Sequence, residues 1–408
     1  MRFEFGFYSS LLLIFFVHGL VYAILLVNRG LRRQSQPDKW LAAFLVLCIL
    51  YISPWMLGFA GWYDNQPYRD ILFYTPFQHL FLIGPVLFFY VQSLLNPSFH
   101  IVRKQLLHLL PAILYILYSI VIVVTDKLVL RTYYFLSDGS DRDFDLWYQG
   151  LGFLSMLIYF LLSLRYYNLY KKFMVQVVSY ADMILFRWVK NFLYAFLVML
   201  VIRLIFHFAS GIPAFARLSY VGAWWEYFSF AIIFYYIAIS GFSNSVETKV
   251  PFKLNLVGDS APLLLDYSGK NDAPAGADII DLEPNLDDPS VDTAIIDEWK
   301  PHVIKIMEEG KIYEDAELTL ATLAKRLKTN PSILSKAINQ GFRSNFNDFI
   351  NAYRVNAVKK MLEAGEHKTQ TLLGIAYSCG FNSKATFNRA FKKATGCSPK
   401  EWLLTNVL

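Results

Sequence analysis

Charged residues are scarce in this chain of 408 residues, and cysteine is nearly absent. Asp, Glu, Lys and Arg make up 17% of the sequence and hydrophobic residues 55%, whereas an ordinary soluble domain is about a quarter charged. This composition excludes a single soluble globule. The three cysteines contain no Cys-x-x-Cys pair, so neither a disulfide framework nor a cysteine-based zinc site is indicated.

Motifs of the common catalytic classes are also missing. The sequence has no P-loop, no His-Glu-x-x-His, no Gly-x-Ser-x-Gly and no obvious inverted repeat with paired broken helices. We therefore predict no catalytic residues, no metal site and no cofactor, and we do not expect an enzyme. Two alternatives stay open: a transporter or membrane enzyme with an appended regulatory domain, and a membrane adaptor whose helical module binds protein.

The charges that are present divide the chain into three parts. Residues 1–243 carry a net charge of +7, residues 244–296 of −7 and residues 297–408 of +6. The first part is apolar and the last has a normal charge content. We therefore predict a membrane domain up to residue 243, an acidic linker over 244–294 and a basic soluble module over 295–408.

The acidic linker has the composition of a flexible segment, with low hydrophobicity, net negative charge and scattered proline. A coil of about 50 residues has a root-mean-square reach of roughly 35–42 Å. Such a tether holds the module near the membrane without fixing its orientation. Two short apolar clusters, at residues 263–265 and 279–280, leave room for local order.

The apolar part contains seven runs long enough to cross a bilayer as helices, which need about 20 mainly apolar residues. The first is no signal peptide, because it continues through Leu25, Leu26 and Val27 past any cleavage site. The seven runs lie near residues 7–28, 40–62, 73–95, 105–125, 147–169, 186–210 and 222–243.

Loop cations predict the orientation of these helices. Lys and Arg accumulate on the cytoplasmic side of membranes, and the loops after helices one, three and five hold eleven of them against six on the other side. The N-terminus is therefore expected outside. Seven crossings then place residues 295–408 in the cytoplasm, and the predicted fold class is all-α: a seven-helix transmembrane bundle plus a cytoplasmic module.

Within the basic module, helical periodicity marks two short helices joined by a tight turn. Leu320, Leu323, Ala324 and Leu327 are spaced as one buried helix face. The turn at residues 328–331 ends that helix, and a second helix begins at the proline, capped by Asn330 or Ser332. This arrangement is typical of a helix-turn-helix, whose second helix can enter a DNA major groove.

The arrangement occurs again after a predicted helix over residues 346–362. Leu372, Ile375 and Ala376 form a buried face, Gly380 suits the left-handed residue that ends a helix, and Asn382 or Ser383 can cap the next helix. The intervening helix of seventeen residues is roughly 25 Å long. That length is of the order needed to place two reading helices in successive major grooves, about 34 Å apart.

The second unit carries the most specific motif of the sequence, and its neighbours extend the pattern. Its segments are Ile375-Ala376-Tyr377-Ser378-Cys379-Gly380-Phe381, Phe387-Asn388-Arg389-Ala390-Phe391-Lys392-Lys393, Gly396 and Ser398-Pro399, with Tyr353-Arg354, Ala357 and Leu362 before them. These residues resemble the DNA-binding module of the AraC/XylS family of bacterial transcription regulators. Ile338 and Leu403 depart from the usual phenylalanine and arginine, and both can pack. The sugar-binding domain of the arabinose regulator is missing, so sugar sensing is not implied.

Residues not needed for the core of the two units are the candidates for DNA contact. Early polar residues of a recognition helix tend to reach base edges, and lysines at its end tend to hold phosphates. The alternative is that the lysines only solvate a surface. The candidates are Ser332, Ser335, Lys336, Asn339, Ser383, Lys384, Thr386, Asn388, Arg389, Lys392 and Lys393.

Ionisable groups inside the apolar runs are candidates for a signal or ligand site, because such groups are costly in a bilayer. Arg203 and His207 are four residues apart on one helix face, and Glu226 lies near the start of the last helix. Together they could bind a charged ligand from outside. A structural Arg–Glu pair is the alternative, and His79 is a further candidate that can equally hydrogen-bond within a bundle.

These observations together predict a one-component transcription regulator in the inner membrane of a bacterium. Its expected partners are double-stranded DNA at a promoter or operator, the lipid bilayer, a second copy in a homodimer, and an unknown signal ligand or membrane partner.

Overall fold

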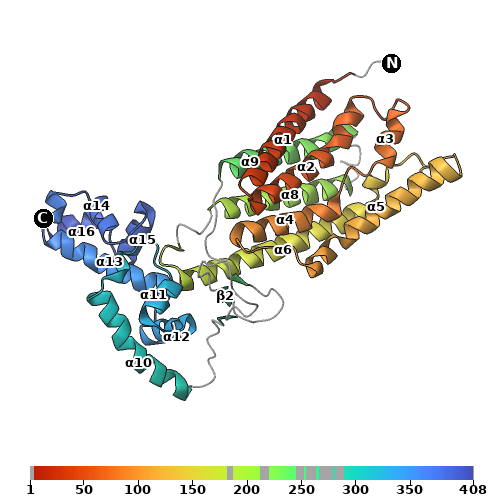
Figure 1. Cartoon of the computed structure of the whole chain (residues 1–408). Coiled ribbons are helices and arrows are strands. Elements are labelled where there is room, and N and C mark those ends of the chain that lie inside the picture. The colour runs from red at the N-terminus through yellow and green to blue at the C-terminus, as the bar shows by residue number, and fades with distance from the viewer. Residues whose placement is uncertain are drawn as a thin grey trace. The chain divides into compact units, whose positions relative to one another are not determined.

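The computed structural model of the chain is predominantly helical (Figure 1). It describes residues 4–181, 187–211, 220–244, 252–253, 263–265, 279–280 and 289–407. The chain folds as two compact units, the first made of Met1–Tyr167 and Arg187–Lys249, the second of Asn168–Phe186 and Val250–Leu408. The helical fold class predicted from the sequence is confirmed.

Within the described residues, six helices are long and apolar enough to cross a membrane. They are α1 (Phe7–Arg32), α2 (Gln36–Phe59), the run Arg103–Val129 that contains α5 (Leu110–Val123) between a 3-10 turn (Arg103–Leu109) and a π turn (Val124–Val129), α6 (Leu146–Val177), α8 (Arg187–Gly211) and α9 (Tyr220–Ser243). The third predicted run, near residues 73–95, instead includes the end of α3 (Tyr68–Tyr74) and the shorter apolar α4 (Leu80–Leu95). A 3-10 turn at Arg142–Phe144 precedes α6.

The first and last of these helices, α1 and α9, run in the same direction. Near their starts, the indole N–H of Trp224 donates to the Tyr8 carbonyl at 3.1 Å. Near their ends, Arg29 donates to the Phe242 carbonyl at 2.6 Å and to Asp38 at 2.7 Å. Two helices of one chain can run in the same direction only if the chain crosses the bundle an odd number of times, counting both helices. The chain therefore makes an odd number of passes from α1 through α9. The N-terminal end of α1 and the C-terminal end of α9 therefore lie at opposite ends of the bundle.

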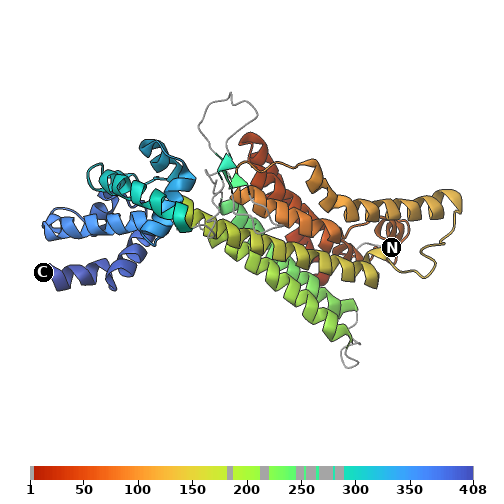
Figure 2. The same cartoon turned by 90° about the horizontal axis from the view of Figure 1, so that it is seen from below.

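The six long helices alone would give an even number of passes, and the short helix α4 supplies the additional one. It runs parallel to α6, because Leu80 meets Gly152 and, one turn later, Gly84 meets Tyr159. Both glycines sit where a Cβ would approach a neighbouring side chain within 3.0 Å, the close packing that small residues allow between membrane helices. The apolar helices of the first unit lie side by side in both views (Figures 1 and 2).

The helices that flank α6 in the sequence, α5 and α8, both run antiparallel to it. The contacting pairs are His108 with Tyr159 and Tyr115 with Tyr148 for α5, and Phe160 with Phe196 and Gln149 with Arg203 for α8. Together with antiparallel α1–α2 and α2–α4 neighbours, this gives seven helices of alternating direction.

The outward faces of these helices are apolar and their polar groups point inward. Ile24 of α1, Leu114 of α5 and Leu161 of α6 are each more than half exposed. The buried polar residues of the bundle include Ser53, Gln78 and Ser163. This pattern is the reverse of a soluble protein and suits helices surrounded by hydrocarbon.

The two apolar clusters of the acidic segment form strands. β2 (Leu263–Leu265) pairs antiparallel with β1 (Phe252–Lys253) and with β3 (Ile279–Ile280), and Leu264 is opposite both Phe252 and Ile280. The remainder of residues 245–288, where a flexible linker was predicted, lies outside the described residues.

The second unit carries both predicted helix-turn-helix arrangements. The first is α11 (Leu320–Leu327) with α12 (Pro331–Lys336) and a π turn (Ala337–Gly341), and the second is α14 (Leu372–Ser378) with α15 (Lys384–Thr395). They are joined by α13 (Phe346–Glu363), preceded by α10 (Pro289–Glu308), and followed by α16 (Pro399–Asn406); 3-10 turns lie at Ile312–Glu314 and Glu366–Lys368. The composition places residues 168–186 in the membrane part, whereas their contacts group them with this unit.

The ends of the short helices follow from their capping residues. Asn330 accepts from the Ser332 amide, and Ser383 from the Thr386 amide, so of the alternatives left open Asn330 and Ser383 are the caps. Gly380 follows α14 at φ +88°, and a Cβ there would lie 2.3 Å from the Tyr313 carbonyl oxygen. Glycine is required at this position for both reasons.

We expect Gly380→Ala to destabilise the second unit by more than the cost of left-handed backbone, which is about 1–2 kcal/mol. The matched control is Gly396→Ala, because Gly396 has φ +81° but no atom within 4 Å of the position that a methyl group would occupy. Calorimetry of the purified chain should show the larger drop in melting temperature for Gly380→Ala. Equal drops in the two variants would contradict this account.

Candidate nucleic-acid interface and bundle cavity

The second helix-turn-helix unit presents α15 from a tightly packed core. Ile375, Phe387 and Phe391 are buried in one cluster with Trp402 of α16 and Leu362 of α13. Because Phe387 and Phe391 occupy one face of α15, the opposite face is left for polar side chains. Lys384, Asn388, Arg389, Lys392 and Lys393 are all exposed there.

Two of the residues predicted to contact DNA are instead part of the packing. Thr386 is 1% exposed, and its hydroxyl lies 2.9 Å from that of the capping residue Ser383. Ser335 of α12 is 8% exposed and accepts from the Asn339 amide group at 3.3 Å. Their surface for a DNA contact is small in this arrangement.

Lys393 is joined to the connecting helix. Its Nζ lies 2.6 Å from Asp348 Oδ2, in the first turn of α13. This ion pair competes with the predicted phosphate contact of Lys393, whereas Lys392, also exposed, extends from the same end of α15. Exposed pairs of this kind contribute about 0–1 kcal/mol to stability, so a phosphate can replace the carboxylate at small cost. Burial lowers the pKa of Arg389, which is still a cation at neutral pH.

The first unit offers a smaller polar surface. Ser332, Lys336 and Asn339 are half-buried at and after α12, where Leu334, Ala337 and Ile338 fill the core. The departure from the family at Ile338 is accommodated, since this side chain is fully buried.

The helical bundle contains a cavity lined by all three residues of the predicted ligand cluster. Arg203, His207 and Glu226 contribute the charged and titratable wall of a space of about 400 Å³. That volume is within the range of small-molecule sites. The rest of the lining is mainly aromatic or aliphatic: Phe144, Leu146, Gln149, Gly150, Phe153, Leu204, Phe206, Ala223 and Tyr227.

The charged groups of the cavity are held by neutral polar partners. Arg203 donates to the Tyr51 hydroxyl at 3.0 Å and to the Gln149 side-chain oxygen, and the Tyr51 hydroxyl lies 3.5 Å from Glu226 Oε1. Among the described residues no ion pair within 4.0 Å joins Arg203 to Glu226. The two charges are therefore bridged through Tyr51, and both line the same open space.

A hydrogen-bonded chain leads from Arg203 to the loop that precedes α6. Gln149 donates to the Gln78 side-chain oxygen at 2.8 Å. The backbone amides of Phe77 and Gln78 donate to Asp143 Oδ2 at 2.7 and 2.9 Å. The Tyr115 hydroxyl donates to the other carboxylate oxygen of Asp143 at 2.6 Å.

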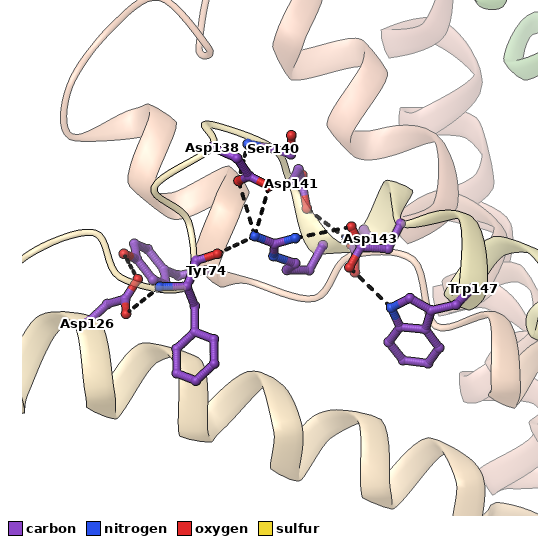
Figure 3. A network of polar contacts seen from close by, with 10 residues as sticks. Tyr74, Asp126, Asp138, Ser140, Asp141, Asp143 and Trp147 are labelled. Atoms are coloured by element: carbon purple, nitrogen blue, oxygen red, sulfur yellow. Dashed lines mark hydrogen bonds and ion pairs between the residues drawn. The ribbon is translucent and has the colours of Figure 1, made fainter.

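The loop itself is organised around Arg142, and its carboxylates Asp138, Asp141 and Asp143 gather in one polar network (Figure 3). Its guanidinium donates to both Asp138 oxygens at 3.1 Å, to Asp145 at 3.4 Å and to the Phe135 carbonyl. On either side, Asp126 accepts from Tyr74 and from the Phe135 amide, and Asp145 accepts from the Trp147 indole. Asp141 and Asp143 are 7% and 2% exposed, and burial raises the pKa of both carboxyls.

The residues that hold Arg203 were not found from the sequence. Gln78 and Gln149 were visible as amides at the ends of two apolar runs, and a search for all polar groups rather than ionisable ones would have included them. Nothing in the sequence distinguishes Tyr51 as a site residue, since tyrosine is frequent throughout the chain. His79 lies at the start of α4 and is not part of the cavity wall. In the described part of the chain, no group of three His, Cys, Asp or Glu could hold a metal ion.

Comparison with known proteins agrees with the geometry of the second helix-turn-helix unit. Residues 323–404 match the family model described as "Helix-turn-helix domain". They form an AraC-type helix-turn-helix domain, which confirms the resemblance predicted from the sequence motifs. No curated protein matches the chain. A solved structure of a protein of unknown function from Listeria innocua is 26% identical, covers 26% of this chain and 95% of that chain, and has a TM-score of 0.23.

The buried carboxyls before α6 predict a pH dependence of stability. A carboxyl whose pKa is higher in the folded than in the unfolded chain holds more protons when folded, so its contribution is complete below about pH 4 and is lost as pH rises. We expect the unfolding midpoint in detergent to fall between about pH 4.5 and about pH 8. In the variant with Asp141→Asn and Asp143→Asn this fall should be shallower.

Asp138→Asn is the matched control for that measurement. Asp138 is in the same loop, but the Ser140 amide and Arg142 lower its pKa, so this variant should keep the decline of the wild type. An equal slope in the wild type and the double variant would show that the pair does not titrate in this range.

Proposed function

We propose that this chain is a membrane-bound one-component transcription regulator, in which the helix-turn-helix domain binds operator DNA and the helical bundle senses a signal. The observation that carries the proposal is the presence in one chain of an AraC-type domain at residues 323–404 and six apolar helices of membrane-spanning length. The proposed location is the inner membrane of a bacterium.

DNA recognition is assigned to the exposed polar face of α15 and to the half-buried polar residues at and after α12. Lys384 and Asn388 lie in the first turns of α15, where side chains reach base edges, and Asn can pair with adenine and Lys with guanine. Lys392 is at the end of the helix, suited to a phosphate. Lys336 and Asn339 are the corresponding candidates of the first unit.

The proposed orientation is supported by the direction of the helices. DNA is in the cytoplasm, the DNA-binding domain follows α9 in the sequence, and the C-terminal end of α9 holds Phe242 beside Arg29. An odd number of passes then puts the N-terminus outside, in agreement with the excess of cations in the predicted cytoplasmic loops. The cavity is lined by the first residues of α6 and α9, and in the proposed orientation it is toward the outer face.

The cavity is the proposed signal site. It combines a cation and an anion that do not neutralise each other directly with aromatic walls, a combination that suits a small charged molecule with an apolar part. A ligand can shift the bundle only by its different affinity for two arrangements. Association of two bundles would raise the effective concentration of the two attached DNA-binding domains, so a homodimer is the proposed active form.

We expect Lys384→Ala and Asn388→Ala each to abolish sequence-specific retardation of DNA, because each removes base contacts worth about 1–3 kcal/mol. The measurement uses the full chain in detergent with duplexes enriched from random sequence by the wild type. Lys392→Ala should instead weaken all duplexes alike and reduce the salt slope by about 1.

Lys400→Ala, an exposed lysine on α16, serves as the control and should leave binding unchanged. Unchanged specific binding in both α15 variants would refute the assignment of the reading helix.

We expect Arg203→Met and Glu226→Gln to make transcription of a reporter under the selected operator insensitive to growth conditions that change it in the wild type. Each variant removes one charged group of the cavity wall. Arg165→Met, which alters an exposed arginine of α6 outside the cavity, is the control and should respond as the wild type does. A normal response in both cavity variants would locate sensing elsewhere.

A further inference from the structure

We propose that residues 178–181, directly after α6, dock on the DNA-binding module through a β-bridge and hydrogen bonds and complete it, so that operator affinity depends on this segment of the membrane half of the sequence. The inference rests on the proposed function for the role of the module in DNA binding. It concerns a part of the chain that neither the sequence motifs nor the family match includes, since the match begins at residue 323.

The backbone of the segment pairs with the residues just before the first helix-turn-helix unit. Val178 forms an antiparallel bridge with Thr319. The Ser179 amide donates to the Leu318 carbonyl at 3.1 Å, and the Ser179 hydroxyl donates to the same oxygen at 2.8 Å. Thr319 is the capping residue of α11. The segment therefore holds the residue from which the first DNA-binding unit begins.

A second set of contacts joins the segment to α13, the helix that connects the two units. The Asn347 side chain donates to the Val178 carbonyl at 3.3 Å. Arg354 donates to the Ser179 hydroxyl at 3.0 Å and to the Ser179 carbonyl at 3.4 Å. Val178 and Ser179 thus contact both the start of the first unit and the helix that connects it to the second.

Arg354 makes these contacts important for stability, because its buried guanidinium depends on them for hydrogen-bond acceptors. Its side chain is completely buried, and burial lowers its pKa to about 10, so the guanidinium is still charged at neutral pH. Its other acceptors are the carbonyls of Tyr313 and Asp315 and the side chain of Asn351. A buried cation needs acceptors for its N–H groups, and Ser179 supplies two of them. A module without the segment would leave part of this charge unsatisfied.

The burial of the segment distinguishes it from an ordinary loop. Val178, Ser179 and Ala181 have no exposed surface, whereas loops between membrane helices usually lie in water. The hydrogen bonds of Val178 and Ser179 to the rest of the module go to Leu318 and α13 and not to the exposed faces of α12 and α15. Docking therefore positions the reading helices rather than covering them.

The same helix contributes to the proposed signal site. α6 begins with Leu146, Gln149, Gly150 and Phe153 in the cavity wall and ends at Val177, next to the docked residues. No glycine or proline interrupts it after Phe153, so it has no built-in kink.

The contact is tested first by cross-linking in the full chain. Val178→Cys and Thr319→Cys are introduced together with Cys397→Ser, since residues opposite each other in an antiparallel pair have Cβ atoms about 4.5–5.5 Å apart, close to disulfide range. Mild oxidation of membranes should give the linked peptides by mass spectrometry. A control pair, Val178→Cys with Thr329→Cys, should not link. Equal linking of both pairs, or none of the first, overturns the docking.

The role in DNA binding is tested by operator affinity of the full chain in detergent. The variant with Ser179→Ala and Asn347→Ala should bind the selected duplex at least tenfold more weakly. Ser163→Ala, which removes another fully buried serine hydroxyl of α6, should stay within twofold. Affinities within twofold of the wild type in both variants would show that docking has no bearing on DNA binding.

Restoring the contact with a disulfide distinguishes a variant that has undocked from one that has unfolded. In the cysteine pair combined with Asn347→Ala, oxidation should restore the affinity and reduction should lower it again. A loss that oxidation does not reverse would count against the proposal. If the wild type itself selects no duplex, the proposed function fails, and the cross-linking result alone decides whether the segment docks.

Discussion

Hydrocarbon offers no hydrogen-bond partner to a buried polar group, and this constraint governs the first unit of the chain. Backbone groups satisfy it within the helices. Side chains satisfy it by pointing inward, where Arg203 is held by Tyr51 and Gln149, and Gln149 in turn by Gln78. The polar interior is therefore one connected network from the cavity to the loop before α6. A change in any one of these groups removes a hydrogen-bond partner from its neighbours.

Arginines with little or no exposed surface recur at the points where segments distant in sequence meet. Arg29 joins α1 to the start of α2 and to the last turn of α9. Arg354 joins α13 to the residues before α11 and to the segment after α6. In each case carbonyl oxygens provide part of the coordination, and a guanidinium suits this because its five donors point in fixed directions. These residues tie together backbone segments that hydrophobic packing alone would leave free to slide.

Much of the second unit could be predicted from local sequence. The spacing of Leu320, Leu323 and Ala324, the cap at Asn330 and the glycine at position 380 each reflect an interaction within a few residues, and each lies where expected. The burial of Thr386 and Ser335 was not predicted, because polar residues on a helix give no sign of which neighbours will cover them. The ion pair of Lys393 with Asp348 joins residues 45 positions apart, and no pattern marks such a pair.

By itself the sequence determined that this chain has an apolar helical part, an acidic segment and a helix-turn-helix module, since composition, periodicity and caps are properties of short stretches. Tertiary structure decided what those stretches contact. It made the short α4 one of seven alternating helices, brought Arg203, His207 and Glu226 to one cavity, and placed residues 178–181 against the DNA-binding module. These outcomes depend on hydrogen bonds and packing between residues far apart in the chain, and such contacts leave no periodic signal in the sequence.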